Sequence, residues 1–221
     1  MKYILKRPSP EQFEKWKKYK RPVKWSDLDG KPFPIDNRIE EAEYYSKHEL
    51  REYLLGEQGA TCCYCEMRIE NDPLRAKIEH VEPREGDTQT ERIFDYANLS
   101  LSCNGGERDP KPKILHCDTY KKDKTIPFSH LEMRCEQELT FTLDGTILGL
   151  TDDGKEVIKT LNLSIPKLNN LRDDAIAGYI YTDQDKTELI ESDEIKLLLA
   201  HLQKSNNLPF KTSILSALRE L

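Results

Sequence analysis

Apolar residues recur along most of the chain at the three- and four-residue spacing of amphipathic helices. Near the start, Phe13 and Trp16 lie on one side of such a pattern, which predicts a helix that ends at Pro22. Ser9 is expected to cap this helix, and Gln12 is expected to complete a capping box. The N-terminal segment therefore begins with an amphipathic helix.

The next segment changes from loop to helix. Residues 22–36 contain three prolines and a glycine, so they are predicted to form a loop. A second helix is predicted from about residue 36 to residue 55, with Leu50 and Leu54 on its apolar face. A capping box at residues 46–49 could break this helix.

In the C-terminal part, the pattern of apolar residues is first strand-like and then helical. Residues 139–143 and 146–150 have strand-like sequences separated by Asp-Gly, which predicts a hairpin with a tight turn. Helical spacing then predicts four helices, at about 153–161, 165–183, 192–204 and 209–220. Ser164 should cap the second of them.

Between these parts, residues 61–124 have little apolar periodicity and many Cys, Pro, Gly and charged residues. Such a composition is expected where a metal ion takes the place of a hydrophobic core. The sequence predicts an α+β, mostly helical protein with three parts: a basic N-terminal arm with helices (1–45), a metal-stapled module (46–124), and a hairpin with a helical C-terminal region (125–221).

Composition and charge narrow down the class of protein. The 221 residues carry a net charge of −6, but residues 1–24 contain nine Lys or Arg against two Glu, and a second basic cluster lies within 108–124. Local basic faces can bind phosphates on an acidic protein. Because no apolar run approaches membrane-spanning length and no signal peptide is visible, we expect a soluble, cytoplasmic protein without a membrane partner.

Five of the six cysteines fall into two groups. In a reducing compartment such spacing indicates metal binding rather than disulfides. Cys62 and Cys65 form a C-x-x-C pair, and Cys103 and Cys117 are the candidate second pair for one structural zinc ion. His116 is the rival fourth ligand. The remaining cysteines, Cys63 and Cys135, are expected to be inert.

A polar motif lies between the two cysteine pairs. Residues 78–83 read Ile-Glu-His-Val-Glu-Pro, and Asn98 follows in Asp-Tyr-Ala-Asn-Leu. A single histidine in a strand usually has a structural role. Here His80 follows Glu79, lacks an apolar run around it and lies between zinc ligands, so we expect a catalytic role.

These residues together resemble a known family. Cys62-x-x-Cys65, Ile78-Glu79-His80-x-x-Pro83, Asn98-Leu99, Cys103 and His116-Cys117-Asp118-x-x-Lys121 are similar to an HNH (ββα-metal) endonuclease with a zinc-supported finger. The chain further resembles the PtuB-like subgroup from Septu and some retron anti-phage systems. The resemblance covers about residues 46–175.

The resemblance implies roles for individual residues. His80 would be the general base, and Asn98 would keep it oriented. Glu79 and Asp118 would bind a catalytic Mg²⁺ or Mn²⁺. His116 is an alternative to Asp118, because the chain inserts residues 104–116 before Cys117, the last of the four cysteines. Lys121 and Lys122, one helical turn further, would bind phosphate.

The resemblance also implies a function and a partner. It predicts a metal-dependent endonuclease that acts as effector in anti-phage defence with a PtuA-like ATPase. DNA is the expected substrate and RNA, such as tRNA, the alternative. Both fit, because HNH fingers contact mostly phosphates, which the two nucleic acids share. A non-catalytic zinc module that binds protein or nucleic acid is the rival from another class; it would need neither Glu79, His80 nor Asn98.

Overall fold

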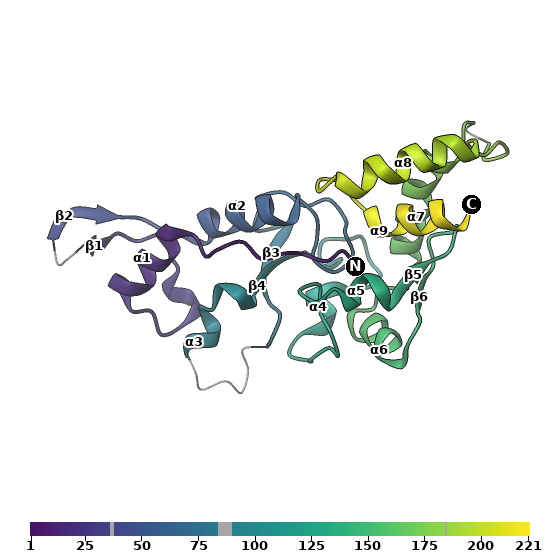
Figure 1. Ribbon diagram of the computed structural model, residues 1–221. Coiled ribbons are helices and arrows are strands. Elements are labelled where there is room, and N and C mark those ends of the chain that lie inside the picture. Colours follow the sequence, from purple (N-terminus) through teal and green to yellow (C-terminus); the bar gives the residue numbers. More distant parts are fainter. Residues whose placement is uncertain (36–37, 84–89, 184) are drawn as a thin grey trace.

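The chain has an α+β fold that combines helices with short two-stranded antiparallel sheets (Figure 1). It is seen in a computed structural model that describes residues 1–35, 38–83, 90–183 and 185–221. The β1–β2 hairpin lies at one end of the molecule and helices α7, α8 and α9 at the other, with the β3–β4 hairpin between them. This arrangement confirms the predicted fold class at the level of α+β with a largely helical C-terminal region.

The first predicted helix is present, but its cap differs from the prediction. Helix α1 spans Glu11–Lys20 and buries Phe13 and Trp16. Its N-cap residue is Pro10, which has no capping side chain, whereas Ser9 donates its hydroxyl to the Glu14 carboxylate at 2.5 Å. The capping box that was predicted from Ser9 and Gln12 is therefore wrong: Ser9 lies one position before the cap, and its hydroxyl is held by Glu14.

The second predicted helix is only partly correct. Residues 36–37 of this prediction lie outside the described residues, and strand β2 (Arg38–Glu43) follows in place of the helix. It pairs antiparallel with β1 (Phe33–Ile35), a strand in the segment that was predicted to form a loop. Helix α2 (Lys47–Gln58) begins only at the capping box, where Ser46 accepts from the His48 amide and Glu49 accepts from the Ser46 amide. The strong cap fixes the helix start, and cross-strand pairing determines the structure of the segment before it.

The middle of the chain is built on one hairpin. Strands β3 (Ala76–His80) and β4 (Leu99–Cys103) pair along their whole length, from Ala76 opposite Cys103 to His80 opposite Leu99. Strand β4 is buried throughout. Three short helical segments accompany it: α3 (Thr90–Ile93) and the 3-10 turn η2 (Tyr96–Asn98) precede it, and α4 (Cys117–Lys121) follows. This hairpin and α4 carry most of the candidate site residues.

The C-terminal prediction is confirmed apart from one cap. Helix α5 leads into the predicted hairpin, and four helices follow within a few residues of the expected bounds. Ser164 does not cap α7; the N-cap residue is Ile165 and Pro166 begins the helix, because proline needs no amide partner there. The elements are α5 (Arg134–Gln137), β5 (Leu139–Phe141), β6 (Ile147–Gly149), α6 (Asp152–Leu161), α7 (Pro166–Ile180), α8 (Ser192–Lys204) and α9 (Lys211–Glu220).

Two hydrophobic clusters form the interior. The larger runs from Met1 to Leu168 and includes the cysteines, whereas the smaller joins the end of α7 to α8 and α9. The segment before α9 is tied to the region around Cys65: the Phe210 amide donates to the Glu66 carbonyl at 3.2 Å, and Arg68 donates to the Asn207 carbonyl at 2.7 Å. Within the described residues, no helix is long and apolar enough to cross a membrane.

Gly59 provides a test of how closely the C-terminal segment approaches α2. Gly59 ends α2 with φ +67°, and a Cβ built there would lie 1.8 Å from the Asn206 carbonyl oxygen. We expect Gly59→Ala to lower the free energy of unfolding by roughly 2 kcal/mol or more, because it adds backbone strain and a clash. Chemical denaturation measures this difference.

Gly178→Ala is the matched control. Gly178 lies in α7, and a Cβ there meets no atom within 4 Å. Alanine should leave stability unchanged or raise it by up to about 1 kcal/mol. Equal stability of both variants would show that residues 206–207 do not pack against α2 as described.

Candidate metal centre and adjoining polar site

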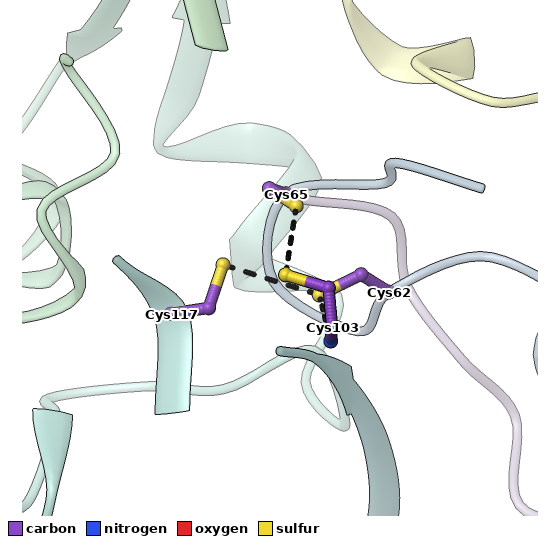
Figure 2. Close-up of side chains that lie close together, drawn as sticks. All are labelled: Cys62, Cys65, Cys103 and Cys117. Atoms are coloured by element: carbon purple, nitrogen blue, oxygen red, sulfur yellow. Dashed lines mark hydrogen bonds between the residues drawn. The ribbon is translucent and has the colours of Figure 1, made fainter. Parts of the chain in front are cut away.

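Three parts of the middle region bring four cysteines together (Figure 2). Cys62 and Cys65 lie in the turn after α2, Cys103 ends β4, and Cys117 begins α4. The turn is shaped by backbone bonds, since the Cys62 amide donates to the Met67 carbonyl at 2.9 Å and the Glu66 amide to the Cys62 carbonyl at 3.0 Å. Local turn geometry thus aims the C-x-x-C pair toward the end of the hairpin.

The four sulfur atoms have the spacing of a metal site. They all lie within 4.8 Å of one another and are buried. Cys62 Sγ is 4.0 Å from Cys117 Sγ, and Cys65 Sγ is 3.9 Å from Cys103 Sγ. A tetrahedral zinc with Zn–S bonds of about 2.3 Å needs sulfurs about 3.8 Å apart. The set fits a structural zinc ion and is the cluster that the sequence predicted.

The electrostatics of the cluster also favour a cation. Burial tends to raise the pKa of Cys62, but hydrogen bonds from the thiols of Cys103 and Cys117 outweigh it and hold that pKa well below its usual value. Burial raises the pKa of Cys117 well above its usual value. The Cys103 amide donates to Cys62 Sγ at 3.2 Å, as is usual for a thiolate acceptor. A divalent metal is the partner that would deprotonate the remaining thiols.

His116 lies beside the four-cysteine set. It is fully buried, and its Nδ1 is 3.2 Å from Cys117 Sγ and 3.9 Å from Cys103 Sγ. Among the described residues, the four cysteines are the one group of three or more Cys, His, Asp or Glu side chains whose ligand atoms are close enough to share a metal. This geometry favours Cys117 as fourth ligand and makes His116 a neighbour that can hydrogen-bond to its sulfur.

A small polar cavity lies near the end of the β3–β4 hairpin. It has a volume of about 220 Å³, and four of its lining residues are predicted site residues. These are Glu79, His80, Asp118 and Lys122. Strand β3 contributes the first two and α4 with the residue after it the others, so the hairpin and the short helix converge on one cavity.

Glu79 is the most constrained group at this cavity. The residue is 4% exposed, and its Oε1 accepts from the Tyr64 hydroxyl at 2.8 Å and from the Lys121 ammonium at 2.6 Å. Burial and the neighbouring Asp118 carboxyl raise the pKa of Glu79 well above its usual value. Two carboxyl groups held this close are a donor pair that suits a hard divalent cation, which would relieve their repulsion.

Two contacts of the His80 ring bear on its orientation and tautomer. Its Nε2 lies 3.0 Å from the Ile93 carbonyl oxygen, and its ring lies 4.6 Å from the Trp25 ring at an interplanar angle of 81°. A carbonyl only accepts hydrogen bonds, so Nε2 must carry the proton. In the neutral ring Nδ1 is then the basic nitrogen.

Asn98 closes the loop that follows His80. Its Oδ1 accepts from the Glu82 amide at 2.7 Å, and its Nδ2 donates to the carbonyls of Glu82 at 3.1 Å and Arg92 at 3.3 Å. The Val81 amide donates to the Asn98 carbonyl at 3.0 Å. Asn98 therefore ties residues 81–82, which directly follow the catalytic candidate, to Arg92 through bonds to backbone groups.

The two lysines predicted to bind phosphate occupy different environments. Lys121 is 1% exposed, and its ammonium donates to Glu79 and, at 3.4 Å, to the His80 carbonyl. Lys122, which follows α4, is exposed and lines the cavity. Only Lys122 is accessible to a phosphate, whereas Lys121 is a buried counter-ion.

Tyr64 and Trp25 belong to this site although no sequence motif pointed to them. Tyr64 lies inside the C-x-x-C turn and reaches Glu79, and Trp25 lies far outside the metal module and reaches His80. The only sequence signal for Tyr64 was its place between two metal ligands.

No family model matches this chain, and no curated protein matches its sequence.

The metal content of the protein tests the cysteine cluster. We expect one zinc ion per chain, lost in Cys65→Ser together with several kcal/mol of stability, because structural zinc sites in small domains contribute about 10 kcal/mol or more of binding free energy. Elemental analysis after desalting measures the zinc. Hydrogen exchange should also increase at the Phe210 and Thr212 amides, which donate to Glu66 beside Cys65.

Cys63→Ala is the matched control, since this neighbouring cysteine is equally buried but is not part of the four-sulfur group. It should retain one zinc per chain. Purified wild-type protein without stoichiometric zinc, or equal zinc loss in both variants, would contradict the assignment.

Proposed function

We propose that this protein is a metal-dependent HNH-type endonuclease that hydrolyses phosphodiester bonds of nucleic acid. The observation that carries the proposal is the convergence of Glu79, His80 and Asp118 on one cavity, with the four-cysteine cluster at the base of the same hairpin and helix. The β3–β4–α4 order is consistent with the two-strand-and-helix unit of that family.

His80 has the features of a general base. Hydrolysis of a phosphodiester needs a water molecule that is deprotonated as it attacks, and a neutral imidazole suits this task near neutral pH. The bond from Nε2 to Ile93 directs basicity to Nδ1, and Asn98 holds the loop that follows the histidine. The ring is thereby oriented before substrate arrives, which lowers the cost of reaching the transition state.

Glu79 and Asp118 would hold the catalytic metal. Carboxylate oxygens are ligands that Mg²⁺ and Mn²⁺ prefer, and Glu79 and Asp118 both line the cavity. When bound, such an ion supplies a Lewis acid that neutralises the charge developing on the leaving oxygen. Tyr64 and Lys121 keep the Glu79 carboxylate in place for this role.

The distribution of positive charge supports a polyanionic substrate. Lys122 lines the cavity, and the exposed lysines of the second basic cluster include Lys111, Lys113 and Lys124. In the N-terminal cluster, Lys15 and Lys17 form ion pairs with glutamates, which neutralise part of the positive charge of these lysines. We propose DNA as the substrate and RNA, such as tRNA, as the alternative, since phosphate contacts serve either.

The biological setting follows from the resemblance over residues 46–175. It supports an effector of anti-phage defence in the cytoplasm that works with a PtuA-like ATPase. The acidic C-terminal helices offer a surface for such a partner, and net acidic surfaces favour basic protein faces.

The rival proposal is a zinc module that binds protein or nucleic acid without catalysis. It accounts for the four cysteines. It does not account for a buried Glu79 that contacts both Asp118 and Lys121, or for a histidine whose tautomer is set by a carbonyl.

Replacement of His80 separates these two proposals. His80→Ala should reduce cleavage by about 100-fold or more, because a general base contributes roughly 10²–10⁴ in rate, while zinc content stays at one per chain. His201→Ala, on the exposed face of α8, is the matched control and should cleave like wild type. Duplex DNA, single-stranded DNA and tRNA should be compared in Mg²⁺, in Mn²⁺ and in EDTA, with and without the ATPase.

The outcomes are distinct. Cleavage of tRNA alone would keep the mechanism and exclude DNA as substrate. Wild-type rates for His80→Ala on every cleaved substrate would refute the mechanism, and binding without any cleavage by wild type would favour the rival module.

A further inference from the structure

Aromatic rings connect the N-terminal helix to His80. The Phe13 ring stacks on Trp16 at 5.7 Å, Trp16 meets Phe94 edge-on at 5.3 Å, and Phe94 stacks on Trp25 at 5.8 Å. Trp25 then lies 4.6 Å from the His80 ring. The series is continuous from α1 to the catalytic candidate, and in Figure 1 α1 lies close to α3.

The same rings also fix the hydrogen-bond partner of His80. Ile93, whose carbonyl accepts from His80 Nε2, immediately precedes Phe94. Phe94 is 4% exposed and is held between Trp16 and Trp25, and its carbonyl lies 3.4 Å from the Lys17 ammonium. Trp25 therefore contacts His80 directly and holds the segment that carries the Ile93 carbonyl.

Trp25 is itself fixed by local structure. It begins the 3-10 turn η1 (Trp25–Asp27), in which the Asp27 carboxylate accepts from the amides of Val23 at 2.9 Å and Lys24 at 3.1 Å. The Lys47 ammonium lies 5.5 Å from the centre of the Trp25 ring, a cation–π distance. The hydrogen-bonded turn on one side and the Phe94 ring on the other restrict the partly buried indole.

We infer that Trp25 is a positioning residue that holds the His80 imidazole in the orientation and tautomer needed for its role as base. This inference rests on the proposed function. A histidine ring turns readily about its terminal torsion unless neighbours restrict it. Trp25, packed nearly perpendicular to the imidazole, limits that rotation and, through Phe94, preserves the bond that keeps the proton on Nε2. The N-terminal arm is thus a part of the active site, although it lies outside residues 46–124.

Two substitutions of Trp25 and one control test the inference. Trp25→Leu removes the ring, Trp25→Phe keeps a smaller one, and Tyr44→Leu makes the same type of change at a side chain that is 66% exposed. The ¹⁵N shifts of the His80 ring, measured where the imidazole is neutral, report which nitrogen carries the proton. Wild type and Tyr44→Leu should show the proton on Nε2, and Trp25→Leu should show a mixture of both tautomers.

Kinetics provide the second readout. In Trp25→Leu the kcat should fall by about 10-fold or more with KM changed less than twofold, because small displacements of a catalytic group reduce the rate without weakening substrate binding. Trp25→Phe should restore most of the kcat. Zinc content and thermal unfolding confirm that each variant is folded; if Trp25→Leu does not fold, Trp25→Phe must still show an intermediate kcat and a partly mixed tautomer.

The outcomes distinguish the two proposals. A single Nε2-protonated tautomer and a wild-type kcat in Trp25→Leu would overturn the positioning role while leaving the nuclease proposal intact. If wild type cleaves no nucleic acid, the proposed function fails, and the ring shifts alone then decide whether Trp25 orients His80.

Discussion

Four buried thiols within 4.8 Å of one another cannot all ionise without a cation, and the rest of the middle region depends on how that constraint is met. The cysteines come from the turn after α2, the end of β4 and the start of α4. A metal bound there fixes α4 against the β3–β4 hairpin. Because Asp118 follows Cys117, and Glu79 lies in the strand paired with β4, the same metal would set where the two carboxyl groups meet.

The cluster reaches beyond its ligands through neighbouring side chains. Tyr64, between Cys62 and Cys65, donates a hydrogen bond to Glu79, so the turn that carries these two cysteines also supports the polar cavity. Glu66, after Cys65, accepts the Thr212 amide through its carboxylate and the Phe210 amide through its carbonyl. Structural stability, the candidate active site and the docking of the C-terminal helices are thus linked to one turn of the chain.

Local signals in the sequence predicted the features that depend on local structure. The C-x-x-C spacing, the Asp-Gly hairpin turn and the helical spacing after residue 152 all correspond to observed elements. The segment 38–43 was predicted as the start of the helix whose apolar face carries Leu50 and Leu54, whereas pairing with β1 makes it a strand. Likewise, the burial of Lys121 against Glu79 and the contact of Trp25 with His80 join residues far apart in sequence, which no spacing rule reveals.

The central claim is that one metal ion is bound by four sulfur atoms. X-ray absorption at the zinc edge of the purified protein tests it most directly, because sulfur and nitrogen neighbours differ in bond length and scattering. The account predicts four sulfur neighbours at about 2.3 Å from a single zinc. A shell of three sulfurs and one nitrogen at about 2.0 Å would replace Cys117 by His116, and a shell of nitrogen and oxygen atoms alone would contradict the four-cysteine centre.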